Sequence, residues 1–391
     1  MDFRGKVVGT TDVVTVHTEG AKIASIHRNS NNNAIGGDDV WVAPAIFDVQ
    51  VNGVGGINYK ADDLTIDQII ETTEWMYQSG TGIWCPTLTT SSAESAINGL
   101  KLLAKACEES KACAASFAGF HIEGPYIGSE DGPRGAHPLE YVRDPDWEEF
   151  LRYQDASGGR IVIFTLAPER NGALEFIEKV SATGVIVSIG HSGASRERIR
   201  EAVAAGAKMS THLGNGAHAM LPRHDNYIWE QLAADGLWAG LIPDGFHLPD
   251  PVLKCFYRAK GKNRICLVSD VASIAGLPPG IYGKDSGLGR SEVHPNGKIS
   301  LAGTPYLAGA GRFLDMGIPN MVAVTDASLS DAIDMASINP AHLLGVDDRV
   351  GSVEAGKEAS LTLFRWQEGQ DKLDVVATVV KGNVVYRGGK E

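Results

Sequence analysis

The sequence lacks three features that would each assign the chain to a particular class of protein. Its five cysteines are scattered over 391 residues without CxxC spacing, which is typical of reduced thiols in a cytosolic protein. No apolar stretch approaches the ~20 residues that a membrane-spanning helix needs. The first residues, MDFRGKVVGT, contain no apolar core of a signal peptide. We therefore predict a cytoplasmic protein with no membrane partner.

The sequence also contains fewer basic than acidic residues. Lys and Arg number 35 against 48 Asp and Glu, which gives a net charge of -13. An acidic surface of this size disfavours nucleic acid and anionic membranes as partners. A small anionic substrate remains compatible with it, because a local basic pocket can oppose the charge of the whole molecule.

The central part of the chain, residues 44–345, alternates between two patterns. Short apolar runs end in polar residues, and helical patterns follow most of them. Strands that alternate with helices predict an α/β fold with a parallel sheet. Eight such runs over about 300 residues favour a closed (β/α)8 TIM barrel over an open sheet. The eight runs are AIFDVQVNG, SGTGIWCPTLTT, SFAGFHIEGPY, RIVIFTLAPE, VIVSIGHSGAS, AKMSTHLGNG, LWAGLIPDGFH and RICLVSDVAS.

Both ends of the chain are rich in valine and other β-branched residues. KVVGT, VVTVHT and KIASIHR near the N-terminus, and ASLTLFRW and DVVATVVKGNVVYRGG near the C-terminus, predict short strands. Lys381, Gly382 and Asn383 predict the turn of a hairpin. We expect residues 1–43 and 346–391 to form one discontinuous antiparallel β-sandwich domain beside a barrel domain of residues 44–345.

Several of the eight runs end in residues that can perform chemistry. In a (β/α)8 barrel the carboxyl ends of the strands meet at one rim, where catalysis takes place. A single histidine in a strand is more often a packed residue than a ligand, but several that converge on one rim favour a site. The residues at these ends are Gln50, Asn52, His121, Glu123, His191, His212, Asp244, His247 and Asp270.

Three of these residues, Glu123, His191 and His212, suit one divalent cation. A catalytic zinc commonly has three nitrogen or oxygen ligands and an open position for water, and iron(II), manganese or cobalt accept the same ligands. Such an ion lowers the pKa of a bound water and polarises a carbonyl. Asp270 could then move a proton from that water to a leaving group.

Each of these residues also has a purely structural interpretation that stays open at this point. Asp270 could cap a helix that begins in SDVAS, and Glu123 could form an ion pair. His121 is interpreted as a packed residue. His137, in the loop sequence GPRGAHP, fits a solvated loop as well as a binding loop, and Arg223 would usually be a surface charge.

At these residues the sequence resembles the amidohydrolase superfamily, and more closely the N-acetylglucosamine-6-phosphate deacetylase family. The resemblance runs from VAPAIFDVQVNG to SINPAHLLGVDDRVGSVEAGKEASLTLF, nearly end to end. GFHIEGPYI, GAHP, SIGHS, STHLGN, DGFHL, LVSDVASIAGLPPGIY and LAGT follow in the order of that family. Each motif alone is weak, but the ordered set is specific.

The resemblance implies a role for each matching residue. Glu123, His191 and His212 match the metal ligands, and Asp270 matches the catalytic acid and base. His137 matches a histidine that contacts the sugar and the amide during catalysis. The resemblance implies that the substrate is held at two further places, which are Asn215 with Gly216 near the sugar, and Arg223 with His247 near the phosphate.

Gln50 and Asn52 stand where many amidohydrolases have His-x-His for a second metal. Neutral amides are poor ligands for a transition metal but can hydrogen-bond a water. The resemblance therefore implies one divalent ion, with zinc preferred over iron, manganese or cobalt. It also implies a homodimer in which a neighbouring subunit helps to complete the phosphate site.

The function expected from the resemblance is deacetylation of an amino sugar phosphate, with N-acetylglucosamine 6-phosphate as the preferred substrate. The segment HLGNGAHAMLPRHDNYIWEQLA departs from the family pattern near the phosphate site. N-acetylgalactosamine 6-phosphate or an N-acyl amino acid therefore stays open as an alternative substrate. A metal-free barrel that only binds a sugar is a further alternative, which the metal-ligand set and Asp270 disfavour.

Overall fold

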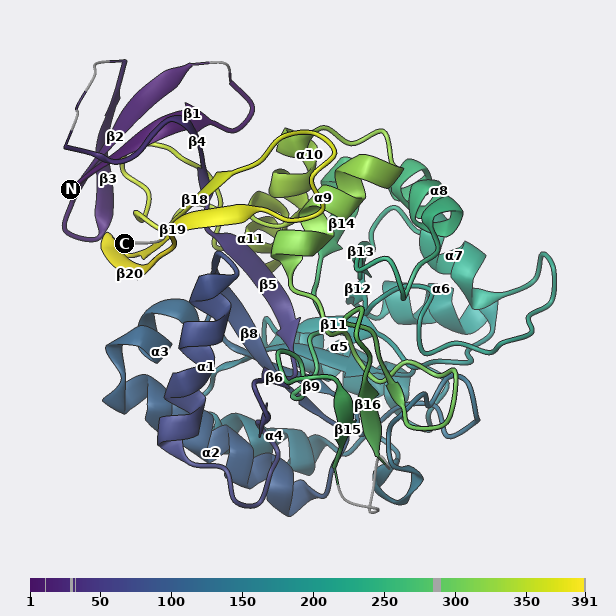
Figure 1. Cartoon of the computed structure of the whole chain (residues 1–391). Coiled ribbons are helices and arrows are strands. Elements are labelled where there is room, and N and C mark those ends of the chain that lie inside the picture. The colour runs from purple at the N-terminus through teal and green to yellow at the C-terminus, as the bar shows by residue number, and fades with distance from the viewer. Residues whose placement is uncertain (11, 29–30, 32, 284–289, 390–391) are drawn as a thin grey trace.

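The computed structural model describes residues 1–10, 12–28, 31, 33–283 and 290–389, and residues 390–391 of the predicted sandwich segment lie outside this range. Figure 1 shows a barrel surrounded by helices, and a separate sheet that contains both the N- and the C-terminus. The predicted fold, a (β/α)8 barrel with a β domain built from both termini, is confirmed. The exact domain boundaries stay a prediction.

The barrel consists of eight strands in the order β14-β13-β12-β11-β10-β9-β8-β5, and all the paired neighbours are parallel. Each of the eight predicted runs supplies one strand. Their bounds are β5 (Ile46–Val51), β8 (Thr81–Thr89), β9 (Phe120–Glu123), β10 (Ile161–Leu166), β11 (Ile186–Ile189), β12 (Ala207–Ser210), β13 (Trp238–Leu241) and β14 (Ile265–Leu267).

The first and last barrel strands meet through residues at their carboxyl ends. The backbone N–H of Asp270 donates to Gln50 O at 3.1 Å, and that of Asn52 donates to Val271 O at 3.0 Å. A parallel bridge pairs Val51 with Val271. These contacts close the barrel and bring the ends of β5 and β14 side by side.

Several of the helices that cover the barrel begin at polar caps. Thr65 caps α1 through a reciprocal capping box with Gln68, and Ser195 caps α6. The helices are α1 (Ile66–Gln78), α2 (Ala93–Glu109), α3 (Lys111–Ser116), α4 (Trp147–Ala156), α5 (Ala173–Ala182), α6 (Arg196–Ala204), α7 (Tyr227–Ala233), α8 (Asp250–Lys260), α9 (Leu314–Val324), α10 (Leu329–Met335) and α11 (Ile338–Leu344), with short 3-10 turns at Leu139–Tyr141 and Lys262–Arg264. None of the described helices is long and apolar enough to span a membrane.

The terminal strands form one seven-stranded sheet in the order β20-β19-β18-β4-β1-β2-β3. Its strands are β1 (Asp2–Val7), β2 (Val13–Glu19), β3 (Lys22–His27), β4 (Ile35–Pro44), β18 (Leu361–Arg365), β19 (Asp374–Val380) and β20 (Asn383–Arg387). The predicted hairpin is confirmed, with Lys381 and Gly382 at φ 47° and 77° between β19 and β20. The expectation of a wholly antiparallel sheet was wrong, because β4 leads directly into the barrel and lies parallel to β1.

Two small sheets were not predicted. One consists of β6 (Gly53–Val54) and β7 (Ile57–Asn58), and the other of β15 (Gly280–Tyr282), β16 (Ser291–Val293) and β17 (Ile299–Leu301). The chain after β17 returns to the barrel rim, where the backbone N–H of Ala310 donates to Asp270 O at 2.9 Å. This contact supports the backbone of Asp270 from outside the barrel.

Asp48 is a fully buried carboxyl group that links β5 to the residue before Asp270. Its two oxygens accept hydrogen bonds from the backbone N–H of Ser269, both at 3.2 Å, and Oδ1 also accepts from the backbone N–H of Gln50 at 3.1 Å. Burial raises the pKa of Asp48 to about 7, although these hydrogen bonds oppose the rise. The carboxyl group is therefore harder to ionise in the folded chain than in the unfolded chain.

We expect this group to make stability depend on pH. Because the folded pKa lies above the unfolded value, the stabilisation is present in acid and is lost as pH rises toward about 7. In the wild type, this group should lower the unfolding free energy by roughly 3 kcal/mol between about pH 5 and pH 8. Asp48→Asn removes the titrating group, so this loss should be absent from the variant. Urea unfolding of both proteins at the two pH values measures it. Asp62→Asn, at an exposed position, is the control and should behave as the wild type does. An equal loss of unfolding free energy in the wild type and in Asp48→Asn would contradict this account.

Candidate active site

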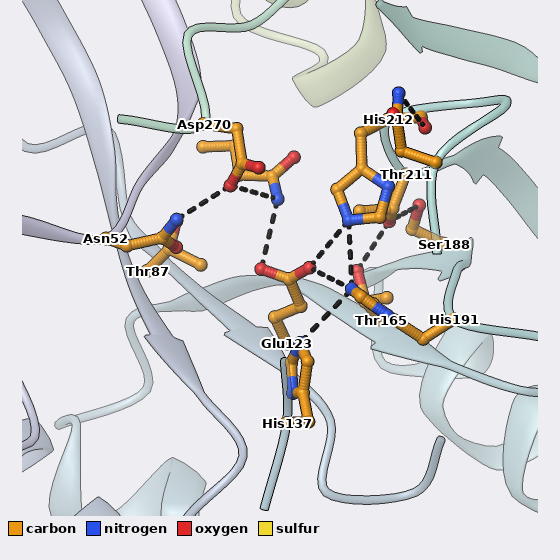
Figure 2. A network of polar contacts seen from close by, with 12 residues as sticks. Asn52, Thr87, Glu123, His137, Thr165, Ser188, His191, Thr211, His212 and Asp270 are labelled. Carbon is orange, nitrogen blue, oxygen red and sulfur yellow. Dashed lines mark hydrogen bonds and ion pairs between the residues drawn. The ribbon is translucent and has the colours of Figure 1, made fainter. Parts of the chain in front are cut away.

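Glu123, His191 and His212 meet at the carboxyl rim of the barrel, as predicted (Figure 2). Oε1 of Glu123 lies 3.0 Å from Nε2 of His191 and 2.9 Å from Nε2 of His212, and the two nitrogens are 3.0 Å apart. All three side chains are buried. Three ligand atoms that face one another in this way match the donor set of a catalytic divalent ion.

The backbone is strained where the site residues lie. Glu123 is the last residue of β9, and His191 and His212 each follow the last residue of their strand by two positions. His191, His212 and Asp270 have φ values of 51°, 29° and 52°, and they are three of the four non-glycine residues with positive φ in the described part of the chain. Such strain persists where the surrounding structure enforces it, and it is frequent at functional sites.

Gln50 and Asn52 hold the carboxylates of the site in place. Nε2 of Gln50 donates to Oε2 of Glu123 and to Oδ1 of Asp270, both at 3.0 Å, and Nδ2 of Asn52 donates to the same Asp270 oxygen at 2.7 Å. Their amide oxygens are buried and have no partner among the described residues. The amides thus connect Glu123 to Asp270, and their two free acceptors suit a water; the predicted water contact itself stays a prediction.

The electrostatics of the two carboxylates differ. Burial and the charge of Glu123 raise the pKa of Asp270, although His212, His247 and the Asn52 hydrogen bond oppose the rise. Burial would also raise the pKa of Glu123, but hydrogen bonds from His191 and His212 hold it well below its usual value. Glu123 therefore stays ionised, as a ligand must, while Asp270 can take up a proton more readily than an ordinary carboxylate.

His137 joins the cluster from the loop between β9 and α4. Its Nε2 lies 3.1 Å from Nε2 of His191, and its Nδ1 lies 2.7 Å from Oγ1 of Thr90 at the end of β8. Burial and the neighbouring His191 lower the pKa of His137 well below its usual value. A neutral imidazole here can donate to, or accept from, a bound substrate.

The loop after His212 folds back over the site. The backbone N–H of Asn215 donates to His212 O at 2.9 Å. Gly216 has φ 56°, and a Cβ on it would lie 2.7 Å from Nδ1 of His191, so a larger residue would collide with the imidazole. Asn215 and Gly216, the two residues predicted to hold the sugar, thus lie beside the metal-ligand candidates.

The two predicted phosphate-binding residues differ in how the structure places them. The side chain of His247 is 4% exposed and its Nδ1 lies 2.8 Å from Oδ2 of Asp244. Arg223 is exposed in the loop before α7, where its backbone oxygen accepts from Nε1 of Trp229 at 3.1 Å. No contact among the described residues joins Arg223 to the rest of the site, and its role stays a prediction.

Two supporting carboxylates were given no role from the sequence: Asp244 was noted at the end of its strand, and Glu169 was missed. Burial would raise the pKa of Asp244, but the hydrogen bond and charge of His247 hold it below its usual value, and the contact orients the imidazole of His247. Glu169, which follows β10, accepts from Oγ of Ser192 and from the backbone N–H of Gly193, both at 2.7 Å. It thus fixes the turn that carries His191. Their positions in the sequence could have indicated a role at the rim, because Asp244 and Glu169 both follow barrel strands.

The remaining polar residues of the rim support the site. His121 is buried and contacts Val49 O at 3.0 Å and Oγ1 of Thr165 at 2.7 Å, in agreement with its interpretation as a packed residue. Arg134 donates to His137 O at 3.0 Å and pairs with Asp131. Arg134 therefore shapes the loop that carries His137.

Comparison with known proteins agrees with this fold and site. Residues 41–385 match the model of the amidohydrolase family. The chain belongs to the amidohydrolase family, whose members are metal-dependent hydrolases.

The similar proteins include deacetylases of amino sugar phosphates. The chain is 31% identical over 356 residues to N-acetylglucosamine-6-phosphate deacetylase of Bacillus subtilis (strain 168), covering 89% of this chain and 85% of that protein. It is 32% identical over 324 residues to N-acetylgalactosamine-6-phosphate deacetylase of Escherichia coli O157:H7, covering 83% of each. The structure of N-acetylglucosamine-6-phosphate deacetylase from Pasteurella multocida superimposes with a TM-score of 0.85 at 26% identity, over 98% of this chain and 99% of that one.

Proposed function

We propose that the protein removes the acetyl group from an N-acetylated amino sugar phosphate, with N-acetylglucosamine 6-phosphate as substrate, and releases acetate and the free amino sugar phosphate. The observation that carries the proposal is the meeting of Glu123, His191 and His212 beside Asp270 at the barrel rim. The names of the similar proteins support the substrate. The cytoplasm is the proposed location, in keeping with the scattered, unpaired cysteines.

Glu123, His191 and His212 would hold one divalent ion, for which we propose zinc. Their facing nitrogen and oxygen atoms fit such an ion, and the free amide oxygens of Gln50 and Asn52 suit a water nearby. A bound ion would polarise the acetyl carbonyl and increase the acidity of a water. We propose no second ion, because the amides of Gln50 and Asn52 are weak ligands for a transition metal.

The proton transfers fall to Asp270. As a carboxylate it accepts a proton from the attacking water, and as an acid it donates that proton to the departing amine, which would otherwise leave poorly. Its raised pKa favours the first step, the uptake of the proton, and the hydrogen bonds from Gln50 and Asn52 to Oδ1 leave Oδ2 for the transfer. His137, neutral and beside His191, would orient the acetyl amide.

The phosphate would lie near His247, whose Nδ1 is 2.8 Å from Oδ2 of Asp244. Asn215 and Gly216 would contact the sugar from the loop over His191. Among the described residues, no contact joins Arg223 to the site of its own chain. We therefore propose that Arg223 binds the phosphate of a substrate held by the neighbouring subunit of a homodimer. This arrangement would account for an exposed arginine in a loop that leads away from the barrel.

The similarity to an N-acetylgalactosamine-6-phosphate deacetylase supports a second candidate substrate, the epimer at the sugar 4-position. Acetate release by the purified, zinc-loaded protein distinguishes the two. We expect a higher kcat/KM for N-acetylglucosamine 6-phosphate than for N-acetylgalactosamine 6-phosphate, and little activity on unphosphorylated N-acetylglucosamine. A higher kcat/KM for N-acetylgalactosamine 6-phosphate would make that compound the substrate instead. Activity on none of the three compounds would contradict the proposed function.

Glu169 offers a test of the metal site that does not depend on turnover. Glu169→Gln keeps the size of the side chain but places an amide NH₂ against Ser192 or Gly193, and thus loosens the turn of His191. We expect zinc affinity to fall by about 10–100-fold, the usual effect of losing a residue that orients a metal ligand. Competition with a chromophoric chelator measures it. Unchanged affinity would contradict this role, and Glu175→Gln on the exposed face of α5 is the control.

A further inference from the structure

Lys60 is a lysine on the barrel rim without an acidic partner. It follows β7 in the connection from β5 to α1 and is half-buried. Its ammonium donates to Oγ1 of Thr89 at 2.6 Å and to Thr90 O at 3.0 Å, both at the end of β8. No carboxylate of the described residues lies within ion-pairing distance of it, so two neutral oxygens are its protein partners.

The position of Lys60 relates it to the active site. Thr90, which accepts from Lys60 through its backbone oxygen, also contacts Nδ1 of His137 through its hydroxyl at 2.7 Å. His137 in turn lies against His191. Thr90 therefore connects Lys60 to His137, whose side chain faces the metal-ligand cluster.

The surroundings of Lys60 are unfavourable for a cation that serves only to fix a loop. Burial lowers the pKa of Lys60 to about 8, and the charge of Glu123 opposes this change. An ammonium group has three N–H donors, and the described residues accept two of them. Lys60 is thus a half-buried cation with one donor that no described residue accepts, and it contacts Thr90, which also contacts His137 of the active site.

We propose that Lys60 binds the substrate and contributes to specificity by donating its third hydrogen bond to a hydroxyl oxygen of the sugar. The phosphate is a less suitable acceptor, because His247 follows β13 and Lys60 contacts the end of β8, and these strands are separated by β5 and β14 in the barrel. This inference rests on the proposed function, since it takes an acylated amino sugar phosphate as the ligand.

Binding to an inactive protein tests the inference. Asp270→Asn and the double variant Asp270→Asn, Lys60→Met, both loaded with zinc, are titrated calorimetrically with N-acetylglucosamine 6-phosphate and with N-acetylglucosamine. Methionine keeps the unbranched apolar chain of lysine without the ammonium group. We expect the Kd of both ligands to rise about tenfold on Lys60→Met, the usual effect of losing a hydrogen bond from a charged donor.

The other outcomes separate the rival explanations. An unchanged Kd, with a lower melting temperature, would mean that Lys60 only fixes its loop to β8 and would overturn the inference. A rise confined to the phosphorylated ligand would overturn the assignment to a sugar hydroxyl. Lys105→Met, at an exposed position of α2, is the matched control. Failure of the proposed function is detected separately, as absence of acetate release by the unmodified protein.

Discussion

Asp270→Asn should lower kcat for acetate release by about 10²–10⁴-fold, the contribution usual for a group that moves protons in the transition state. The amide cannot accept a proton from water or return one to the amine. The substitution leaves an oxygen for the hydrogen bonds from Gln50 and Asn52, so the fold and the ion should remain. Steady-state kinetics with zinc content measured on the same samples checks both expectations.

A matched control comes from another buried aspartate. Asp315 is 2% exposed and pairs with Lys372 at 3.2 Å in the first turn of α9. Asp315→Asn tests whether the loss of any buried carboxylate lowers kcat. Near-normal turnover of Asp270→Asn would contradict the proposed mechanism, and an equal fall in Asp315→Asn would show that the effect on Asp270 is not specific.

His212→Ala should remove the bound ion and, with it, the activity. The substitution deletes one of three ligand atoms that lie about 3 Å apart. We expect zinc after dialysis to fall to roughly a tenth of the wild-type content and acetate release to fall in proportion. Metal analysis by mass spectrometry, with acetate assayed on the same preparation, measures the two quantities together.

The control for this variant is a histidine outside the rim. His342→Ala removes an exposed imidazole of α11 that pairs with Asp347. It should keep its zinc and its activity. A His212→Ala protein that retains a full equivalent of zinc would contradict the proposed ligand set, because two remaining ligands and water hold the ion far less tightly.

The positions of the metal-ligand candidates could be predicted because they depend on local patterns. Each of Glu123, His191 and His212 ends an apolar run or follows it within two residues, and a closed barrel places all such ends at one rim. The hairpin at Lys381–Gly382 was predictable for the same reason, since the residue types of a tight turn are adjacent in sequence.

The contacts that complete the site could not be predicted, because they join distant segments. Gln50 donates to Glu123 and Asp270, which are 73 and 220 residues away in the sequence. Lys60 was not singled out in the sequence, because its contact with Thr89 forms only when β8 is in place. The sheet of β15–β17 was missed because its three-residue strands are too short to establish a period.

A zinc titration of the metal-free protein tests the central proposal, a deacetylase that works with one ion, most directly. Zinc is added in steps to protein freed of metal with a chelator, and the rate of acetate release from N-acetylglucosamine 6-phosphate is recorded at each step. The account predicts no activity without zinc and a rate that rises linearly to a plateau at about one equivalent per chain. Full activity of the metal-free protein, or a plateau only at about two equivalents, would contradict it.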